Sequence, residues 1–209
     1  MTEADNRSFW DGRRGRYEVW FVTLSRPDGA LGYWVRYSIL APLAGPPESR
    51  LWFARFDRRD PARTFGLNGP PPGLLVAVEP GALPLLWGHA TCEAGAARGA
   101  LAGGGHHVRW DLGWEMGQPS FRVLPPVLYR RGMAPSRPYS PNPVARISGR
   151  IEVDGEEVRL ERWPGQQGHM EGSGTPSGGR GHLAPPTRAA TRSRRWPPKP
   201  GAARRRCRC

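Results

Sequence analysis

Charged side chains within otherwise apolar strands are the residues of this sequence best suited to chemistry. Glu18, Arg36, Asp57 and Glu115 each lie in a run of hydrophobic residues. A carboxyl group that points into an apolar interior has a raised pKa and can donate a proton near neutral pH. It could protonate an alkene, while neighbouring aromatic rings stabilise the resulting carbocation. Glu18 and Asp57 are therefore candidate catalytic residues.

The same charged residues also have a structural interpretation, and it is the commoner one in proteins. They can lie on the outward face of a strand, or form Glu–Arg pairs between neighbouring strands. Glu18 and Arg36 are the expected pair of this kind, because the two runs that contain them are predicted to form a hairpin.

The histidines show no metal-ligand pattern. His106 and His107 are adjacent, so in a strand they point to opposite faces and cannot chelate together. No metal or other cofactor is expected. His169 ends the segment PGQQGH and is the third candidate catalytic residue, with a structural hydrogen bond as the alternative.

Aromatic residues could line a site for an apolar ligand, because pockets for small molecules are mostly apolar with a few polar groups. Tryptophan is also a favoured strand residue, so core and rim positions are the alternative. The candidate ligand-binding residues are Trp20, Trp34, Arg36, Trp52, Trp110 and Trp114.

The elements that position these residues are predicted to be strands. Residues 17–24 and 33–40 are rich in Val, Trp, Tyr and Phe and flank RPDG, a turn in which Pro sets φ and Gly supplies a positive φ. Asp154-Gly155 is a second hairpin turn. Further strands are predicted at 51–57, 74–80, 83–94, 106–115, 121–130, 145–153 and 156–163.

The fold class that follows is all-β. No segment has a long 3.6-residue apolar period, and strands with two partly apolar faces suit an antiparallel barrel or sandwich. The segment GAARGALAGGG is predicted to be a flexible loop.

Composition changes sharply near Met170. From there to the end the chain holds nine Arg, one Lys and one Glu, so this segment carries +9 of the total +13. Residues 170–209 are predicted to be a disordered basic tail, because they have too few apolar residues to form a core. No leader or long apolar run precedes them, which predicts a cytoplasmic protein without a membrane span.

Several segments in order resemble a known superfamily. They are WDGRRGRYEVWFVTLSRPDGALGYWVRYSILAP, LWFARFD, VRWDLGWE and YSPNPVARISGRIEVDGEEVRLERWPGQQGH. Residues 10–169 thereby resemble the lipocalin-like (calycin) superfamily of carotenoid 1,2-hydratases, or hydroxyneurosporene synthases, and tocopherol cyclase-like proteins. The resemblance implies two consecutive barrels, with residues 1–169 forming the first.

The second barrel expected from this resemblance does not follow in frame. When the codons of Ser173 to Gly181 are displaced by one base, they permit Arg-His-Ala-Gln-Arg-Trp-Ala-Trp, which resembles a family segment. We therefore hypothesise a frameshift after Gly168 or His169.

Function is predicted from the resemblance together with the aromatic strands. The leading hypothesis is binding of a hydrophobic, isoprenoid-like small molecule by a truncated member of this superfamily, with hydratase or cyclase chemistry undecided. The alternatives are a non-catalytic lipocalin-type carrier and nucleic-acid binding through the basic tail. The sequence indicates no oligomeric state.

Overall fold

The structure is a computed structural model that describes residues 4–69, 85–87, 90–116, 119–130 and 133–173. The chain divides into two units, 1–177 and 178–209, and all described residues belong to the first. Its strands are β1 (Arg16–Ser25), β2 (Leu31–Ala41), β3 (Glu48–Asp57), β4 (Phe65–Gly69), β5 (Leu85–Trp87), β6 (Ala90–Glu93), β7 (Ala96–Gly103), β8 (His106–Trp114), β9 (Phe121–Arg122), β10 (Ser136–Val153) and β11 (Glu156–Ser173). The described residues also form three short 3-10 helices: η1 (Ala4–Asn6) before β1, η2 (Pro61–Arg63) between β3 and β4, and η3 (Pro126–Tyr129) between β9 and β10.

Both predicted hairpins are confirmed. At the first turn the Arg26 N–H donates to the Leu31 carbonyl at 2.7 Å, and Gly29 has a φ of +67°. At the second, Asp154 and Gly155 have φ values of 54° and 84°, the pair of left-handed residues that a tight two-residue hairpin needs.

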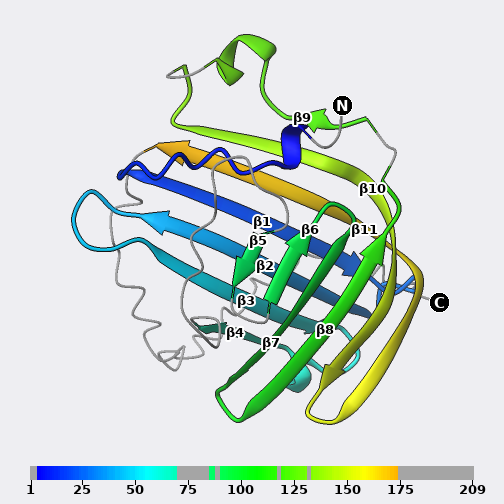
Figure 1. Cartoon of the computed structure of the whole chain (residues 1–209). Coiled ribbons are helices and arrows are strands. Elements are labelled where there is room, and N and C mark those ends of the chain that lie inside the picture. Colours follow the sequence, from blue (N-terminus) through cyan, green and yellow to red (C-terminus); the bar gives the residue numbers. More distant parts are fainter. Residues whose placement is uncertain (1–3, 70–84, 88–89, 117–118, 131–132, 174–209) are drawn as a thin grey trace, which may run out of the picture. The chain divides into compact units, whose positions relative to one another are not determined.

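The described strands form one antiparallel sheet of 11 strands, so the all-β prediction is confirmed. Its order is β4-β3-β2-β1-β11-β10-β8-β7-β6-β5, with β9 paired to β10. The sheet curls into a half-barrel, in which the long strands β10 and β11 bend from one side to the other (Figure 1). Rings therefore meet between strands that are not neighbours, as Phe53 of β3 and Trp110 of β8 do at 5.9 Å between centroids.

Side chains fill the inner face of this half-barrel. Tyr37 and Trp110 lie at its centre, where the Trp110 Nε1–H donates to Tyr37 Oη at 2.7 Å. Tyr37 Oη in turn donates to the Arg98 carbonyl of β7 at 2.7 Å, so it links the two sides of the curled sheet. The centre of the inner face is thus a packed aromatic core crossed by a buried polar bridge.

Three predictions about elements were wrong. The predicted loop at 95–105 contains β7, and the predicted strand at 121–130 consists of the short β9 followed by η3. β11 continues four residues past His169 to Ser173, beyond the predicted boundary of the β-domain. The predicted strand at 74–80 and most of the predicted tail lie outside the described residues.

Candidate functional site

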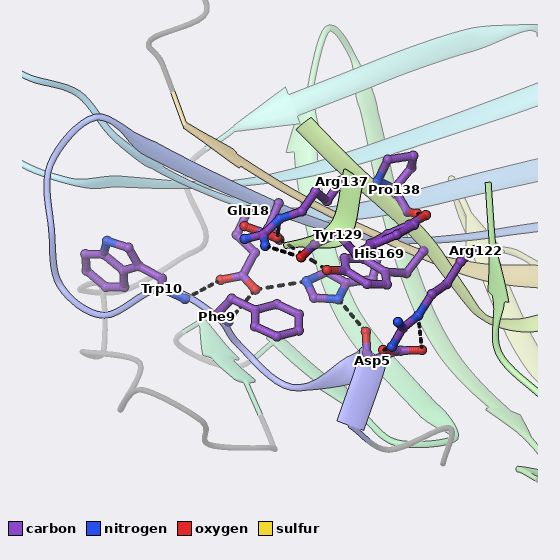
Figure 2. A network of polar contacts seen from close by, with 11 residues as sticks. Asp5, Phe9, Trp10, Glu18, Arg122, Tyr129, Arg137, Pro138 and His169 are labelled. Atoms are coloured by element: carbon purple, nitrogen blue, oxygen red, sulfur yellow. Dashed lines mark hydrogen bonds and ion pairs between the residues drawn. The ribbon is translucent and has the colours of Figure 1, made fainter. Parts of the chain in front are cut away.

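The candidate site is a polar group of side chains at one end of the inner face. Strand alternation places Glu18 and Trp20 of β1 on this face, together with His169 and Glu171 of β11. Antiparallel pairing sets Trp20 opposite His169 and Glu18 opposite Glu171. The candidates Glu18 and His169 therefore come together although they are 151 residues apart (Figure 2).

Glu18 is only 1% exposed, and its two carboxyl oxygens have four hydrogen-bond partners. Its Oε1 accepts from the Phe9 N–H at 2.7 Å and lies 2.9 Å from His169 Nε2. Its Oε2 accepts from Ser8 Oγ at 2.9 Å and from the Trp10 N–H at 3.0 Å. Its four partners fix the position of this buried carboxyl group.

His169 is completely buried and is held through both ring nitrogens. Nδ1 lies 2.6 Å from the Asp5 carbonyl oxygen, which can only accept, so Nδ1 carries a proton. The ring stacks between Trp20 and Phe9, at centroid distances of 4.8 and 5.6 Å. The other ring nitrogen, Nε2, lies 2.9 Å from Glu18 Oε1, so the two buried side chains share one hydrogen bond.

Two further ion pairs extend this network. Arg137 of β10 pairs with Glu171, and Arg122 of β9 binds Asp5 at 2.7 Å. The Tyr139 hydroxyl lies 3.4 Å from Glu171, and burial, followed by the charge of Glu171, raises the pKa of this phenol. The network therefore holds residues 5–10 against β1, β9 and β11.

A pocket of about 370 Å³ opens beside this network. Both carboxyl groups, Glu18 and Glu171, line it, and so does the guanidinium of Arg137. Its aromatic wall includes Phe9, which is 43% exposed, and Trp10. The pocket combines hydrogen-bond acceptors with an aromatic wall, which suits a small molecule with one polar end and an apolar body.

The expected pair of Glu18 with Arg36 was wrong. Glu18 lies opposite Ile39 in the register of β1 and β2, whereas Arg36 lies opposite Phe21. The two charged residues therefore point to opposite faces of the sheet. Glu115, the other carboxyl group singled out, is 89% exposed at the end of β8 and lies 3.6 Å from Arg162.

Arg36 belongs to an aromatic group on the outer face, away from the pocket. Its guanidinium carbon is 5.9 Å from the ring centroid of Trp34 and 5.2 Å from that of Trp52. Burial lowers the pKa of Arg36. The predicted ligand-binding residues are therefore divided between two places. The outer face holds Trp34, Arg36 and Trp52, and the buried inner face holds Trp20, Trp110 and Trp114.

The remaining candidates take other positions. Trp20 and Trp110 are core residues, and Trp114 is nearly buried at the end of β8. Asp57 lies at the far end of β3, where its carboxylate binds Arg55 at 3.0 Å. The N–H of Asp60, followed by Arg55, lowers the pKa of Asp57, so Asp57 acts here as an anion that binds donors.

Sequence reasoning missed the N-terminal residues and the last residues of β11. Asp5 and Ser8 lie in an irregular segment, where no period shows which side chains are buried. Glu171 was assigned to the tail, although the alternation of Gln167, His169 and Glu171 is a period-two signal. The compositional change that begins at Met170 hid that signal.

The described residues contain no helix long and apolar enough to cross a membrane. In the same part of the chain, no three His, Cys, Asp or Glu side chains gather as a metal site would require.

Comparison with known proteins finds longer relatives. An uncharacterized protein of Mycobacterium tuberculosis, present in strains CDC 1551 and H37Rv, is 30% identical over 165 residues, which are 79% of this chain and 48% of the relative. The chain thus spans about half the length of the curated relatives it matches. No family model matches the chain.

Solved structures show the fold. A protein of Nitrosomonas europaea assigned as AttH aligns with a TM-score of 0.52 at 20% identity, over 76% of this chain and 52% of that one. Kievitone hydratase from Nectria haematococca aligns with a TM-score of 0.45 at 12% identity, over 84% of this chain and 54% of that one, a likeness too weak to argue from. The comparisons therefore agree with the all-β fold described above, and the chain matches about half the length of its relatives.

Proposed function

We propose that this chain binds a hydrophobic, isoprenoid-like small molecule in the pocket beside Glu18 and Glu171. The observation that carries the proposal is the pairing of two nearly buried carboxyl groups with an aromatic wall in one pocket of about 370 Å³. A hydroxyl group on the ligand would donate to a carboxylate, and its apolar body would contact Phe9 and Trp10.

The centre of the half-barrel is a poorer location for the same ligand. Tyr37, Phe53 and Trp110 are each no more than 1% exposed, and the Trp110 ring contacts the other two rings there. A ligand at the centre would have to displace well-packed rings and break the bonds of the Tyr37 hydroxyl, whereas the pocket beside Glu18 is already open.

Tryptophan fluorescence tests the binding proposal. Geraniol added to the full chain should quench part of the emission, and its saturated hydrocarbon analogue 2,6-dimethyloctane should bind more weakly because it has no hydroxyl group. Trp10→Phe should remove the change, because Trp10 lines the pocket. Trp52→Phe is the matched control on the outer face and should retain it. Equal quenching in the two variants would refute this location.

The Glu18–His169 hydrogen bond favours a second candidate function, hydration of an alkene. Glu18 would transfer a proton to one alkene carbon, water would add to the other carbon, and the proton that water releases would return to Glu18. His169 would hold the carboxylate in place and share its proton, since only 2.9 Å separates Nε2 and Oε1. Asp57 has no part in this step, because it is the last residue of β3, whereas Glu18 lies level with the first residues of that strand.

Product analysis in ¹⁸O-labelled water tests the catalytic candidate. The full chain incubated with geraniol should form an alcohol that carries the label, and Glu18→Gln should not. Glu115→Gln is the matched control, because that carboxyl group is 89% exposed and outside the pocket. Circular dichroism must show that the Glu18→Gln protein is folded. No labelled product from the unmodified chain, or equal rates in both variants, would argue for a carrier without this activity.

A further inference from the structure

A segment rich in exposed apolar side chains precedes β10. Its first eight residues, FRVLPPVL at 121–128, include a single polar residue, Arg122. Residues 121–130 are called the apolar loop below, and three of their large apolar side chains are 45–59% exposed: Phe121, Val123 and Val127. In the described part of the chain eight large apolar side chains are exposed, so three of them belong to this one loop. Exposed apolar side chains gathered in this way mark a surface that contacts a partner or a membrane.

One side of the apolar loop is fixed to the sheet. β9 pairs with β10, and the Arg122 guanidinium lies over the rings of Tyr129 and Tyr139, at 5.2 and 5.8 Å from their centroids. The Tyr129 hydroxyl donates to the Pro138 carbonyl of β10. Successive side chains of a strand point to opposite sides, so Phe121 points away from these contacts. The loop thus presents its apolar side chains to solvent, beyond β10 (Figure 1).

The backbone of the apolar loop is suited to leaving water. Pro125 and Pro126 have no N–H group to desolvate. The N–H groups of Leu124 and Leu128 are bonded inside the loop, to the Tyr129 hydroxyl at 3.2 Å and to the Pro125 carbonyl at 2.9 Å. An unbonded backbone donor is costly in an apolar medium, so these features lower the cost of entering one.

Charge favours an anionic lipid surface as the occupant. Arg130 is exposed at the end of the loop, and the chain carries a net charge of +13. At the surface of a bilayer, apolar side chains enter the boundary between headgroups and acyl chains, and cations remain beside the lipid phosphates. Exposed apolar side chains followed directly by an exposed arginine match both layers.

We propose that the apolar loop binds the surface of a membrane that contains anionic phospholipids. Phe121, Val123 and Val127 enter the headgroup and acyl boundary, and Arg130 pairs with a lipid phosphate. This binding does not depend on the ligand of the pocket beside Glu18.

Co-sedimentation of the full chain with phospholipid vesicles tests the proposal. The unmodified chain should bind vesicles made of equal parts phosphatidylcholine and phosphatidylglycerol. Phe121→Ser/Val127→Ser should bind about tenfold more weakly at the same net charge, because two large apolar side chains no longer leave water. Arg130→Gln should bind about fivefold more weakly, the effect of one arginine beside an anionic surface.

Two control variants keep the apolar loop intact. Leu43→Ser/Val144→Ser removes two apolar side chains that are 69% and 62% exposed outside the loop, and Arg159→Gln removes a cation that is 84% exposed on β11. Both controls should bind vesicles as the unmodified chain does. Every variant keeps residues 170–209, so binding through that basic segment would be equal in all of them.

Three results would overturn the proposal. The first is no vesicle binding by the unmodified chain, and the second is equal binding by the loop variants and their controls. The third is self-association in sedimentation velocity without lipid that Phe121→Ser/Val127→Ser abolishes, which would assign the loop to a contact between two copies of the chain. Near-ultraviolet circular dichroism of each variant should match that of the unmodified chain, because all the substituted side chains are exposed.

Discussion

His169 joins parts of the chain that are far apart in sequence. Nδ1 binds the Asp5 carbonyl, 164 residues away, and Nε2 binds Glu18 on β1. Replacing it with Phe keeps the stacking on Trp20 but leaves the carbonyl and the buried carboxyl group without this partner. We expect His169→Phe to lower the free energy of unfolding by about 3–5 kcal/mol, the usual cost of removing one member of a buried pair. Urea titration measures this loss.

His106→Phe is the control for the same substitution at an exposed site. His106 stacks on Phe65 and pairs with Asp154, but its side chain is 36% exposed. Exposed pairs contribute at most about 1 kcal/mol, so this variant should remain close to the unmodified chain. Equal losses in the two variants would show that the ring, and not its buried hydrogen bonds, is what matters at position 169.

Surface carboxylates determine how stability responds to acid. Arg26 and the Ala30 N–H lower the pKa of Asp28 to about 2, from an ordinary value of 3.8. A carboxyl group whose folded pKa is depressed stabilises the fold above its unfolded pKa and loses that effect as pH falls through the folded value. The melting temperature should therefore fall between about pH 4 and pH 2.

Asp28→Asn tests the share of this residue in the acid response. The variant should show a shallower fall over that window, because its side chain cannot be protonated there. Glu115→Gln is the control, since the exposed Glu115 accepts no close hydrogen bond in the described structure and should leave the slope unchanged. An unchanged slope in Asp28→Asn would assign the acid sensitivity to other carboxylates.

β7 shows why a strand can look like a loop in sequence. Its residues AARGALAG are mostly small, and the Trp110 ring of β8 lies against the glycine at its centre. A Cβ on Gly99 would lie 2.2 Å from a carbon of the Trp110 ring, so only glycine fits there. Gly99→Ala should therefore cost about 1–3 kcal/mol in urea unfolding, as overpacking does elsewhere.

Gly103→Ala is the matched control in the same strand. A Cβ at that position would meet Leu67 at 4.0 Å, an ordinary contact, and its cost should be within about 0.5 kcal/mol of zero. If the two alanine variants were equally stable, the Trp110 ring would not be fixed over Gly99 as described. The requirement for glycine arises from a partner strand, which local composition does not reveal.

At the scale of the whole molecule, local patterns predicted the hairpins and the all-β class because turn residues and strand alternation are local properties. Glu18 and His169 were predicted separately, as chemically capable residues. Their contact depends on the pairing of β1 with β11, which closes over about 150 intervening residues and leaves no local signal.

The buried end of β11 also refines the frameshift hypothesis. Glu171 is 4% exposed and paired with Arg137, and Gly172 lies beneath the Tyr17 ring, with the position of a Cβ only 2.5 Å from it. Residues so well fitted to their neighbours are expected to be in frame, so we place the shift after Gly172, not at His169.

Sequencing the gene tests this refinement. We expect that one inserted or deleted base after codon 172 opens a frame encoding Arg-His-Ala-Gln-Arg-Trp-Ala-Trp from the codons of Ser173 to Gly181. That frame should continue toward the length of the relatives, of which this chain spans 48%. Under this hypothesis the Arg-rich composition comes from GC-rich codons read out of register, so the restored segment should lose most of the +9 charge. If no single-base change opens such a frame, residues 173–209 are a genuine basic segment, and salt-dependent nucleic-acid binding by the full chain becomes the test to make.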